Sequence, residues 1–361
     1  MGALTSFTGK GRLRLPFPIF FRRLFLTGAA LLAHAASSPE AQREAGTGVA
    51  LAHDGKYREA IGAYRRAIAL DPELPNIQLN LGLAYFKLRD LAHAAPAFER
   101  ALRADAGNFQ VQALLGMSYF GLGRFADAVA PFEKATGAQP ENVELRHKLA
   151  ESCLYSGHYT QALREFEALL RAHPDSAPVH MFAAQALDAL GESDAAIKEL
   201  KAAAKAAPGL PTIHFGLGYL YWKYRNFEAA EREFRAELKI DPDNAGAAAY
   251  LGNVLLKAGK DGEAMAWLKR ALGHKEESAL ALLDIGVIHA NRREYAEALT
   301  MLRKAARVDP GRADVHYRLA SVYKSLGRTE EAKKELADVS GLHKRTDQEI
   351  MLKVTGPPKR E

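Results

Sequence analysis

The stretch FQVQALLGMSYFGLGRFADAVAPFEKATGAQPEN, residues 109–142, contains two apolar runs joined by the turn sequence Leu122-Gly123-Arg124. In each run the apolar residues recur three or four positions apart, which is the spacing of one face of an α-helix. The tight turn between the runs predicts an antiparallel helix pair. Pro140 predicts the end of the second helix, because proline lacks a backbone N–H and disfavours helix in the preceding residue.

The same pattern repeats every 34 residues from Ala41 to Thr346, without insertion or deletion. The nine units span residues 41–74, 75–108, 109–142, 143–176, 177–210, 211–244, 245–278, 279–312 and 313–346. A small column comprises Gly48, Gly82, Gly116, Ala150, Ala184, Gly218, Gly252, Gly286 and Ala320. An alanine column comprises Ala60, Ala94, Ala128, Ala162, Ala196, Ala230, Ala264, Ala298 and Ala332. A large column comprises Tyr64, Phe98, Phe132, Phe166, Leu200, Phe234, Leu268, Leu302 and Leu336.

These columns have a physical explanation in a stack of helix pairs. Small residues allow two helix backbones to approach closely, and the large residue, one turn after the alanine, fills the space between helices. One helix pair cannot bury its apolar faces alone, so successive pairs stack and form a continuous core. The sequence therefore predicts an all-α solenoid.

The pattern resembles the tetratricopeptide repeat family, in which positions 8, 20, 24 and 32 are small, alanine, aromatic and proline. The resemblance covers residues 41–346 and implies a right-handed superhelix of helix-turn-helix units. Proline closes six of the units, and Ala106, Glu276 and Lys344 replace it in the others. Glu237 stands at position 27, where the family has a small residue.

The basic character of the chain lies almost entirely at its N-terminus. The 361 residues carry a formal net charge of +6, yet five basic residues precede the first acidic residue, Glu40. Removing those five from the 49 Lys and Arg leaves 44 against 43 Asp and Glu. A nucleic-acid-binding surface needs clustered, uncompensated Lys and Arg. The nearly neutral body therefore argues against a nucleic-acid partner.

Residues 1–35 have the pattern of an export signal. Arg22 and Arg23 precede the run Leu24–Ala36, whose 13 residues are mostly apolar. As a helix this run would span about 20 Å, against a hydrocarbon core of ~30 Å. The sequence Ala33-His34-Ala35 predicts cleavage after Ala35. Residues 36–40 then form a short linker.

The destination of the protein follows from this segment. We expect an exported protein of the periplasm or cell envelope. The sequence Arg22-Arg23-Leu24-Phe25-Leu26 also resembles the twin-arginine motif, which is an alternative to general secretion. An uncleaved segment would instead anchor the protein in the inner membrane, and only then would the membrane be a partner.

The C-terminal residues 347–361 follow the ninth unit. Thr346 and Glu349 form a capping-box pattern before the apolar residues Ile350, Met351 and Leu352, which predicts the start of a helix. Gly356 and two prolines predict its end. We expect a short capping helix that covers the last repeat, followed by a tail.

The sequence offers little chemistry. Phosphate-binding loops, HExxH and nucleophile elbows are absent. Glu144, His147 and Glu151 share one predicted helix face, but a metal site would need matching ligands from facing helices, and Met117 and Gln185 stand there. The single cysteine, Cys153, has no adjacent base and is expected to be a buried apolar residue. We expect no metal, no cofactor, no small-molecule substrate and no enzyme activity.

The resemblance implies a binding groove on the concave side, lined by the first helix of each unit. The chaperone-tail variant of the family holds a terminal carboxylate with Lys and Asn, but Ala45, Val49, Leu79 and Leu83 stand at those positions here. Aromatic and Met residues are enriched at binding surfaces. The predicted groove residues are Phe86, Met117, Phe120, His147, Glu151, Tyr155, Gln185, Asp188, Phe215, Tyr219 and Trp222.

The predicted function is a non-catalytic scaffold that binds a segment of a partner protein in this groove. Phe215, Tyr219 and Trp222 form one aromatic stripe, although part of it could pack against a neighbouring helix. Two alternatives remain open. The chain could be a self-associating assembly factor of the envelope, or an adaptor held in the membrane by an uncleaved N-terminal helix.

Overall fold

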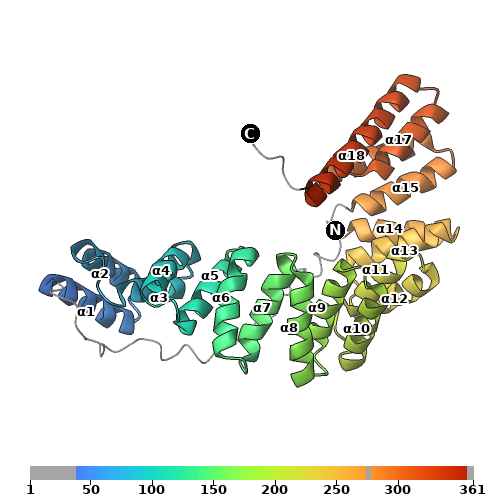
Figure 1. Ribbon diagram of the computed structural model, residues 1–361. Coiled ribbons are helices and arrows are strands. Elements are labelled where there is room, and N and C mark those ends of the chain that lie inside the picture. The colour runs from blue at the N-terminus through green and yellow to red at the C-terminus, as the bar shows by residue number, and fades with distance from the viewer. Residues whose placement is uncertain (1–37, 274–277, 356–361) are drawn as a thin grey trace. The chain divides into compact units, whose positions relative to one another are not determined.

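The computed structural model describes residues 38–273 and 278–355, and all regular elements in these ranges are α-helices (Figure 1). The first helices of the nine pairs are α1 Pro39–His53, α3 Ile77–Lys87, α5 Phe109–Gly121, α7 Val143–Tyr155, α9 Ala177–Ala189, α11 Ile213–Lys223, α13 Ala245–Lys257, α15 Ala279–Asn291 and α17 Ala313–Ser325. The second helices are α2 Tyr57–Leu70, α4 Leu91–Ala104, α6 Phe125–Ala138, α8 Tyr159–Ala172, α10 Ser193–Ala206, α12 Phe227–Ile240, α14 Asp261–Gly273, α16 Tyr295–Val308 and α18 Thr329–Thr355.

The chain forms two compact units, residues 1–206 and residues 207–361. Unit 1 contains α1 to α10 and unit 2 contains α11 to α18. Within each unit, a first helix packs against its own second helix, which then packs against the first helix of the next pair. This arrangement confirms the predicted all-α repeat solenoid as the fold class.

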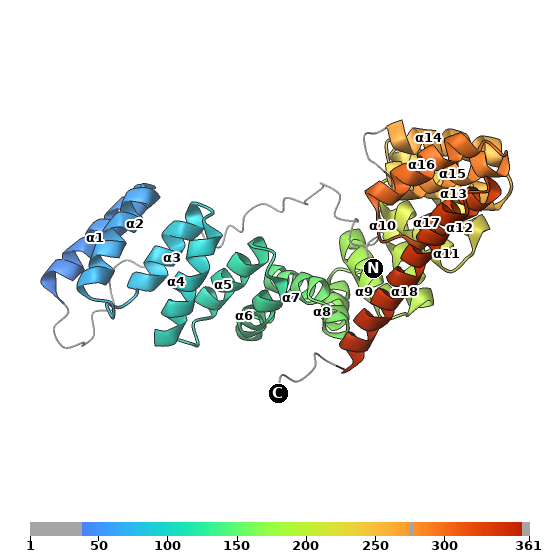
Figure 2. The same ribbon diagram turned by 90° about the horizontal axis from the view of Figure 1, so that it is seen from above.

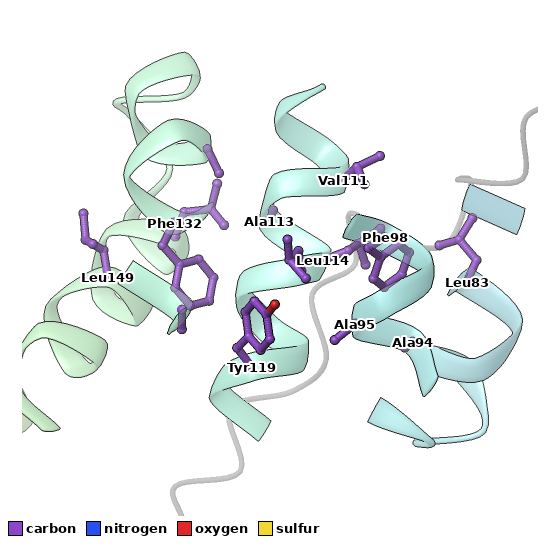
Figure 3. Packing of buried hydrophobic residues seen from close by; sticks show 14 of the residues in the cluster. Leu83, Ala94, Ala95, Phe98, Val111, Ala113, Leu114, Tyr119, Phe132 and Leu149 are labelled. Atoms are coloured by element: carbon purple, nitrogen blue, oxygen red, sulfur yellow. The ribbon is translucent and has the colours of Figure 1, made fainter. Parts of the chain in front are cut away.

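The small and large columns meet inside each helix pair. A Cβ atom added to Gly116 of α5 would lie 2.8 Å from Cδ1 of Phe132, so only a residue without a side chain leaves room for the ring at this approach. Figure 3 shows Phe132 between the helix that carries Ala113 and Leu114 and the helix that carries Leu149. The predicted explanation of these columns is therefore confirmed.

The last pair of helices differs from the others in its large column. Eight members, from Tyr64 to Leu302, are at most 2% exposed, whereas Leu336 of α18 is 48% exposed. In the preceding pairs, the next first helix covers this position, and no helix pair follows α17 and α18 in the described chain.

The turn inside each pair has one conformation in all nine repeats. Six turns place a glycine in the left-handed region, as at Gly123 with φ 73°, and three place an arginine there: Arg89, Arg225 and Arg293. The residue that follows donates its N–H back to the first helix, as Arg124 does to the Tyr119 carbonyl at 2.9 Å. This closure satisfies carbonyl groups that the helix end would otherwise leave unpaired.

The closing prolines follow the second helices by two residues, as in α6, which ends at Ala138 before Pro140. Lys344 replaces proline at this position in the ninth unit, and α18 continues without a break to Thr355 (Figure 2). The predicted separate capping helix after Thr346 is therefore wrong. A capping-box sequence does not start a new helix where nothing ends the previous one, and no proline occurs between Thr329 and Thr355.

The predicted export signal and linker lie almost wholly outside the described residues, which begin at Ser38. Among the helices that are described, none is both long enough and apolar enough to cross a membrane.

Candidate functional site

Aromatic side chains from three helices of unit 1 meet in one cluster. The ring centroids of Phe120 in α5 and Phe125 in α6 lie 5.2 Å apart, and those of Phe125 and Tyr155 in α7 lie 4.9 Å apart. The Lys148 Nζ lies 4.4 Å from the centroid of the Phe120 ring, within cation–π range. The three aromatic residues are half-buried, so they retain surface for a partner. We call Phe120, Phe125 and Tyr155 the unit 1 aromatic cluster.

An ion-pair network lies beside this cluster on α7. His147 Nδ1 is 2.8 Å from Glu151 Oε1, and Lys148 Nζ is 2.9 Å from Glu151 Oε2. Burial acts to raise the pKa of Glu151, but the two basic neighbours outweigh it and hold the pKa below its usual value. Each carboxylate oxygen therefore lies within ion-pair distance of a basic side chain. Burial raises the pKa of Glu144, which is the third residue of the predicted face.

The other predicted residues of unit 1 vary in exposure. Phe86, Met117 and Gln185 are half-buried, and Phe86 packs edge-on against Phe98 with ring centroids 6.3 Å apart. Glu151 and Asp188 are only 8% and 7% exposed, so the groove prediction is wrong for these two side chains. The first helices of neighbouring pairs, such as α7 and α9, touch one another and cover part of the predicted face.

A second aromatic cluster lies in unit 2. Ring centroids are 5.9 Å apart between Tyr219 and Trp222 of α11, and both rings contact Tyr250 of α13 at 5.6 and 4.9 Å. All three residues are half-buried. We call Tyr219, Trp222 and Tyr250 the unit 2 aromatic cluster.

Phe215 is 8% exposed and belongs to the core, so its prediction as a groove residue is wrong. Its ring lies 6.0 Å from those of Phe234 and Tyr250, because α12 and α13 close over this part of α11. The aromatic stripe is thus divided between the core and a partly exposed surface.

A line of hydrogen bonds joins three first helices of unit 2. Trp222 Nε1 donates to Asn253 Oδ1 at 2.8 Å, and Asn253 Nδ2 donates to Asp284 Oδ2 at 2.7 Å. Asp284 is 4% exposed, and burial raises the pKa of its carboxyl to about 6 even though Asn253, Lys257 and Arg312 act in the opposite direction. The line holds the Trp222 ring in place relative to α13 and α15.

Phe125, Tyr250 and Asn253 take part in these clusters and were not predicted. Phe125 is the first residue of a second helix, and large residues recur at this position in most repeats. That column is a sequence signal which could have identified it: Tyr57, Leu91, Phe125, Tyr159, Phe227 and Tyr295. Asn253 lies 34 residues after Tyr219 and so stands in a column of predicted groove residues, which could have identified it. Tyr250 stands in no such column.

Sequence models described as TPR repeat and tetratricopeptide repeat match the chain along most of its length. The matched residues are 48–88, 79–143, 113–154, 147–211, 215–281 and 292–348. The chain belongs to the tetratricopeptide repeat family. Proteins of this repeat fold typically act as non-catalytic scaffolds.

One curated relative is the human protein O-mannosyl-transferase TMTC1, which is 35% identical over 86 residues. The match covers 23% of the chain, and the chain spans 9% of the length of that relative.

Solved tetratricopeptide repeat structures share the fold. A repeat protein from Parabacteroides merdae has 17% identity and a TM-score of 0.53, and the match covers 68% of the chain and 97% of that structure. The APC/C hetero-tetramer Cut9-Hcn1 has 15% identity and a TM-score of 0.54, with 84% and 73% covered. PilF of Pseudomonas aeruginosa has 18% identity and a TM-score of 0.51, with 59% and 97% covered. At these identities the similarity shows the fold alone.

Among the described residues of this tetratricopeptide repeat protein, the side chains of His316, Glu335 and Asp338 lie close enough to share a metal ion. His316 Nδ1 is 2.7 Å from Glu335 Oε2, and its Nε2 is 3.3 Å from the Pro310 carbonyl oxygen. In another repeat His180 contacts Glu199 and the Pro174 carbonyl in the same way. The His–Glu pair is therefore a recurring contact between repeat elements.

Cys153 of α7 is fully buried, as predicted. Burial, with smaller contributions from Glu133 and Glu165, raises the pKa of its thiol to about 12. The thiolate that acts as a nucleophile or metal ligand is therefore not formed near neutral pH.

Asp284→Asn is expected to stabilise unit 2 at neutral pH. A pKa raised from 3.8 to about 6 penalises the ionised form in the fold, by about 3 kcal/mol at most. The parent protein therefore loses stability as the pH rises from about 4 to 6, and the variant lacks this loss. The introduced amide still offers a carbonyl oxygen to Asn253.

This difference can be measured by urea unfolding of both proteins at several pH values, followed by tryptophan fluorescence. The two curves should coincide near pH 4 and separate above pH 6, with the variant more stable. Other carboxyls titrate identically in both proteins and cancel in the comparison. A constant gap at all pH values would contradict the raised pKa.

Proposed function

We propose that this tetratricopeptide repeat protein is a non-catalytic scaffold that binds segments of partner proteins along the first helices of its repeats. The observation that carries this proposal is the pair of half-buried aromatic clusters, one in each unit. Rigid aromatic side chains supply contact area at low entropic cost, which makes them frequent anchors in protein interfaces.

The proposal does not include the transferase activity in the name of the human relative. That match covers only 9% of the relative. The helices described here are accounted for by the repeats. In them, the nucleophile candidate Cys153 is buried and the Glu151 carboxylate is held by two basic side chains.

Photo-crosslinking in cells tests the scaffold proposal. Lys87 lies at the end of first helix α3 beside Phe86, and Lys134 lies on second helix α6; both are exposed. We expect a benzophenone amino acid placed at position 87 to form adducts with a defined partner protein. The same group at position 134 should not form those adducts, because its helix belongs to the other layer.

Mass spectrometry of the adducts identifies the partner and the crosslinked segment. Circular dichroism of both purified variants controls for folding. Equal adducts from the two positions would indicate random collision, and no protein adduct from position 87 would contradict binding at the first helices of unit 1.

We further propose that the protein is exported to the periplasm or cell envelope. Support comes from residues 1–35, where Arg22 and Arg23 precede a short apolar run and an Ala-His-Ala sequence. N-terminal sequencing of the mature protein from an envelope fraction should give a start at Ala36. A start at Met1 would instead favour the membrane-anchored adaptor.

A further inference from the structure

We propose that the first-helix face of unit 2 binds an acidic protein segment that carries an apolar anchor. This inference rests on the proposed scaffold function and specifies the partner of one of its two surfaces. The face comprises the unit 2 aromatic cluster and the exposed basic residues of the first helices: Lys223, Lys257, Arg318 and Lys324.

The first helices of unit 2 carry an excess of positive charge. Their acidic residues are Asp284 and Asp314, of which the first is buried and the second pairs with Arg312 Nη2 at 2.7 Å. The four basic residues above are all exposed. Outward-facing charge on these helices is therefore mainly positive, whereas the chain beyond its N-terminal segment is nearly neutral.

The first helices of unit 1 show a smaller excess of outward-facing positive charge. Of their four basic residues, Arg43 pairs with Glu40, Arg146 with Glu165 and Lys148 with Glu151. Since the two units share one fold, this difference in charge separates the kinds of segment that each can attract. An acidic segment complements unit 2 better than unit 1.

Two of the positive charges belong to the same helices as the aromatic cluster, Lys223 to α11 and Lys257 to α13. Lys223 follows Trp222 directly, and Lys257 stands one helical turn after Asn253, which accepts the Trp222 hydrogen bond. Arg312 lies near enough to Tyr250 and Asp284 to influence the pKa of both groups. A bound segment can thus place an apolar side chain on the aromatic rings and carboxylates beside the basic groups.

A protein segment fits this face better than a nucleic acid does. The hydrogen-bond line from Trp222 through Asn253 to Asp284 uses the polar groups of Trp222 and Asn253 internally.

Fluorescence polarisation with three labelled peptides tests the proposal on the full chain. The first peptide alternates glutamate with leucine, the second replaces every glutamate by glutamine, and the third replaces it by lysine. We expect binding of the glutamate peptide alone, with an affinity that falls as salt rises. Equal binding of the glutamine peptide, or preferential binding of the lysine peptide, would overturn the proposal.

Matched charge reversals locate the binding face. Lys223→Glu with Lys257→Glu should weaken binding of the glutamate peptide about tenfold or more, because two attractive contacts become repulsive. Lys239→Glu with Lys269→Glu makes the same change on second helices α12 and α14 and should leave the affinity unchanged. An equal loss from both pairs would show non-specific attraction and overturn the assignment.

An unlabelled single-stranded RNA serves as a competitor in the same assay. The RNA is added so that its phosphates and the carboxylates of the peptide are at equal concentration. Displacement of the glutamate peptide would then mean that the face recognises polyanions in general, which overturns the inference. Failure of these peptide tests would leave the crosslinking result at position 87 intact, since that position lies in unit 1. The two proposals can therefore fail separately.

Discussion

Replacing Glu237 by alanine is expected to lower the free energy of unfolding of unit 2 by about 4 kcal/mol. Glu237 of α12 is completely buried, and its carboxylate accepts hydrogen bonds from the backbone N–H groups of Thr212 at 2.7 Å and Phe215 at 3.1 Å. It also accepts a bond from Asn244 Nδ2 at 3.1 Å. Alanine would leave these three donors, of which Phe215 is buried and the other two are half-buried, without this acceptor.

The start of α11 depends on this carboxylate for a second reason. Thr212 has a φ of 78° and no side-chain cap, and a β-branched residue rarely adopts this left-handed conformation. The corresponding residue before α3 is Asn76, which tolerates positive φ better. In that repeat, Ala101 stands at the position that corresponds to Glu237. The start of α3 therefore has no carboxylate at this position to accept its backbone N–H groups.

Tryptophan fluorescence reports on this change selectively, because both tryptophans, Trp222 and Trp267, lie in unit 2. The denaturant midpoint of the fluorescence signal should fall in Glu237→Ala. Glu237→Gln keeps one acceptor oxygen and should show a smaller loss.

Adding Thr212→Asn to Glu237→Ala should restore about 1 kcal/mol, because asparagine reduces the strain at this position. An unchanged fluorescence midpoint in Glu237→Ala would show that the carboxylate does not support α11.

Gly116→Val is expected to lower the stability of unit 1 by about 3 kcal/mol. The first atom of the new side chain would lie 2.8 to 3.0 Å from three atoms of the fully buried Phe132 ring. Neither helix can move away freely, because α5 packs against α4 on one side and α6 packs against α7 on the other. The clash between the valine and Phe132 therefore strains α5 and α6, in the middle of unit 1.

Gly137→Val provides the matched control on α6. No atom lies within 4 Å of a Cβ atom built at Gly137, so valine should slightly stabilise the helix there. Hydrogen exchange of α5 and α6, measured by mass spectrometry, should accelerate in the first variant and not in the second.

Gly116→Ala with Phe132→Leu reproduces the pair Ala184 and Leu200 of the fifth repeat and should be tolerated better than Gly116→Val. Equal acceleration of exchange in both glycine-to-valine variants would contradict the close approach as the cause.

Much of the fold could be predicted because its signals are local and repeated. The left-handed turn residues, the closing prolines and the small and large columns act within one helix pair, and nine copies reveal them. The end of α18 could not be predicted in this way. Thr346 and Glu349 match a capping pattern, but the state of the preceding residues decides whether a helix starts there.

The binding surface was predicted less well than the fold. The helical period places Phe215, Tyr219 and Trp222 on one stripe, yet Phe215 is buried under neighbouring rings while the other two remain partly exposed. The bonds from Trp222 to Asn253 and from Asn253 to Asp284 each span 31 residues and not the 34 of the repeat. They pass diagonally between helices, so no column of the sequence records them.

The sequence by itself determined the nine helix pairs, the close contact inside each pair and the neutrality of the body, because helical spacing and turn chemistry are properties of short segments. Only the tertiary structure decided which side chains of a first helix are covered. That depends on how closely the next first helix approaches, and the approach is set by packing across repeats. The same packing buried Glu237 under the start of α11 and left Lys223 and Lys257 exposed on the helices of the unit 2 aromatic cluster.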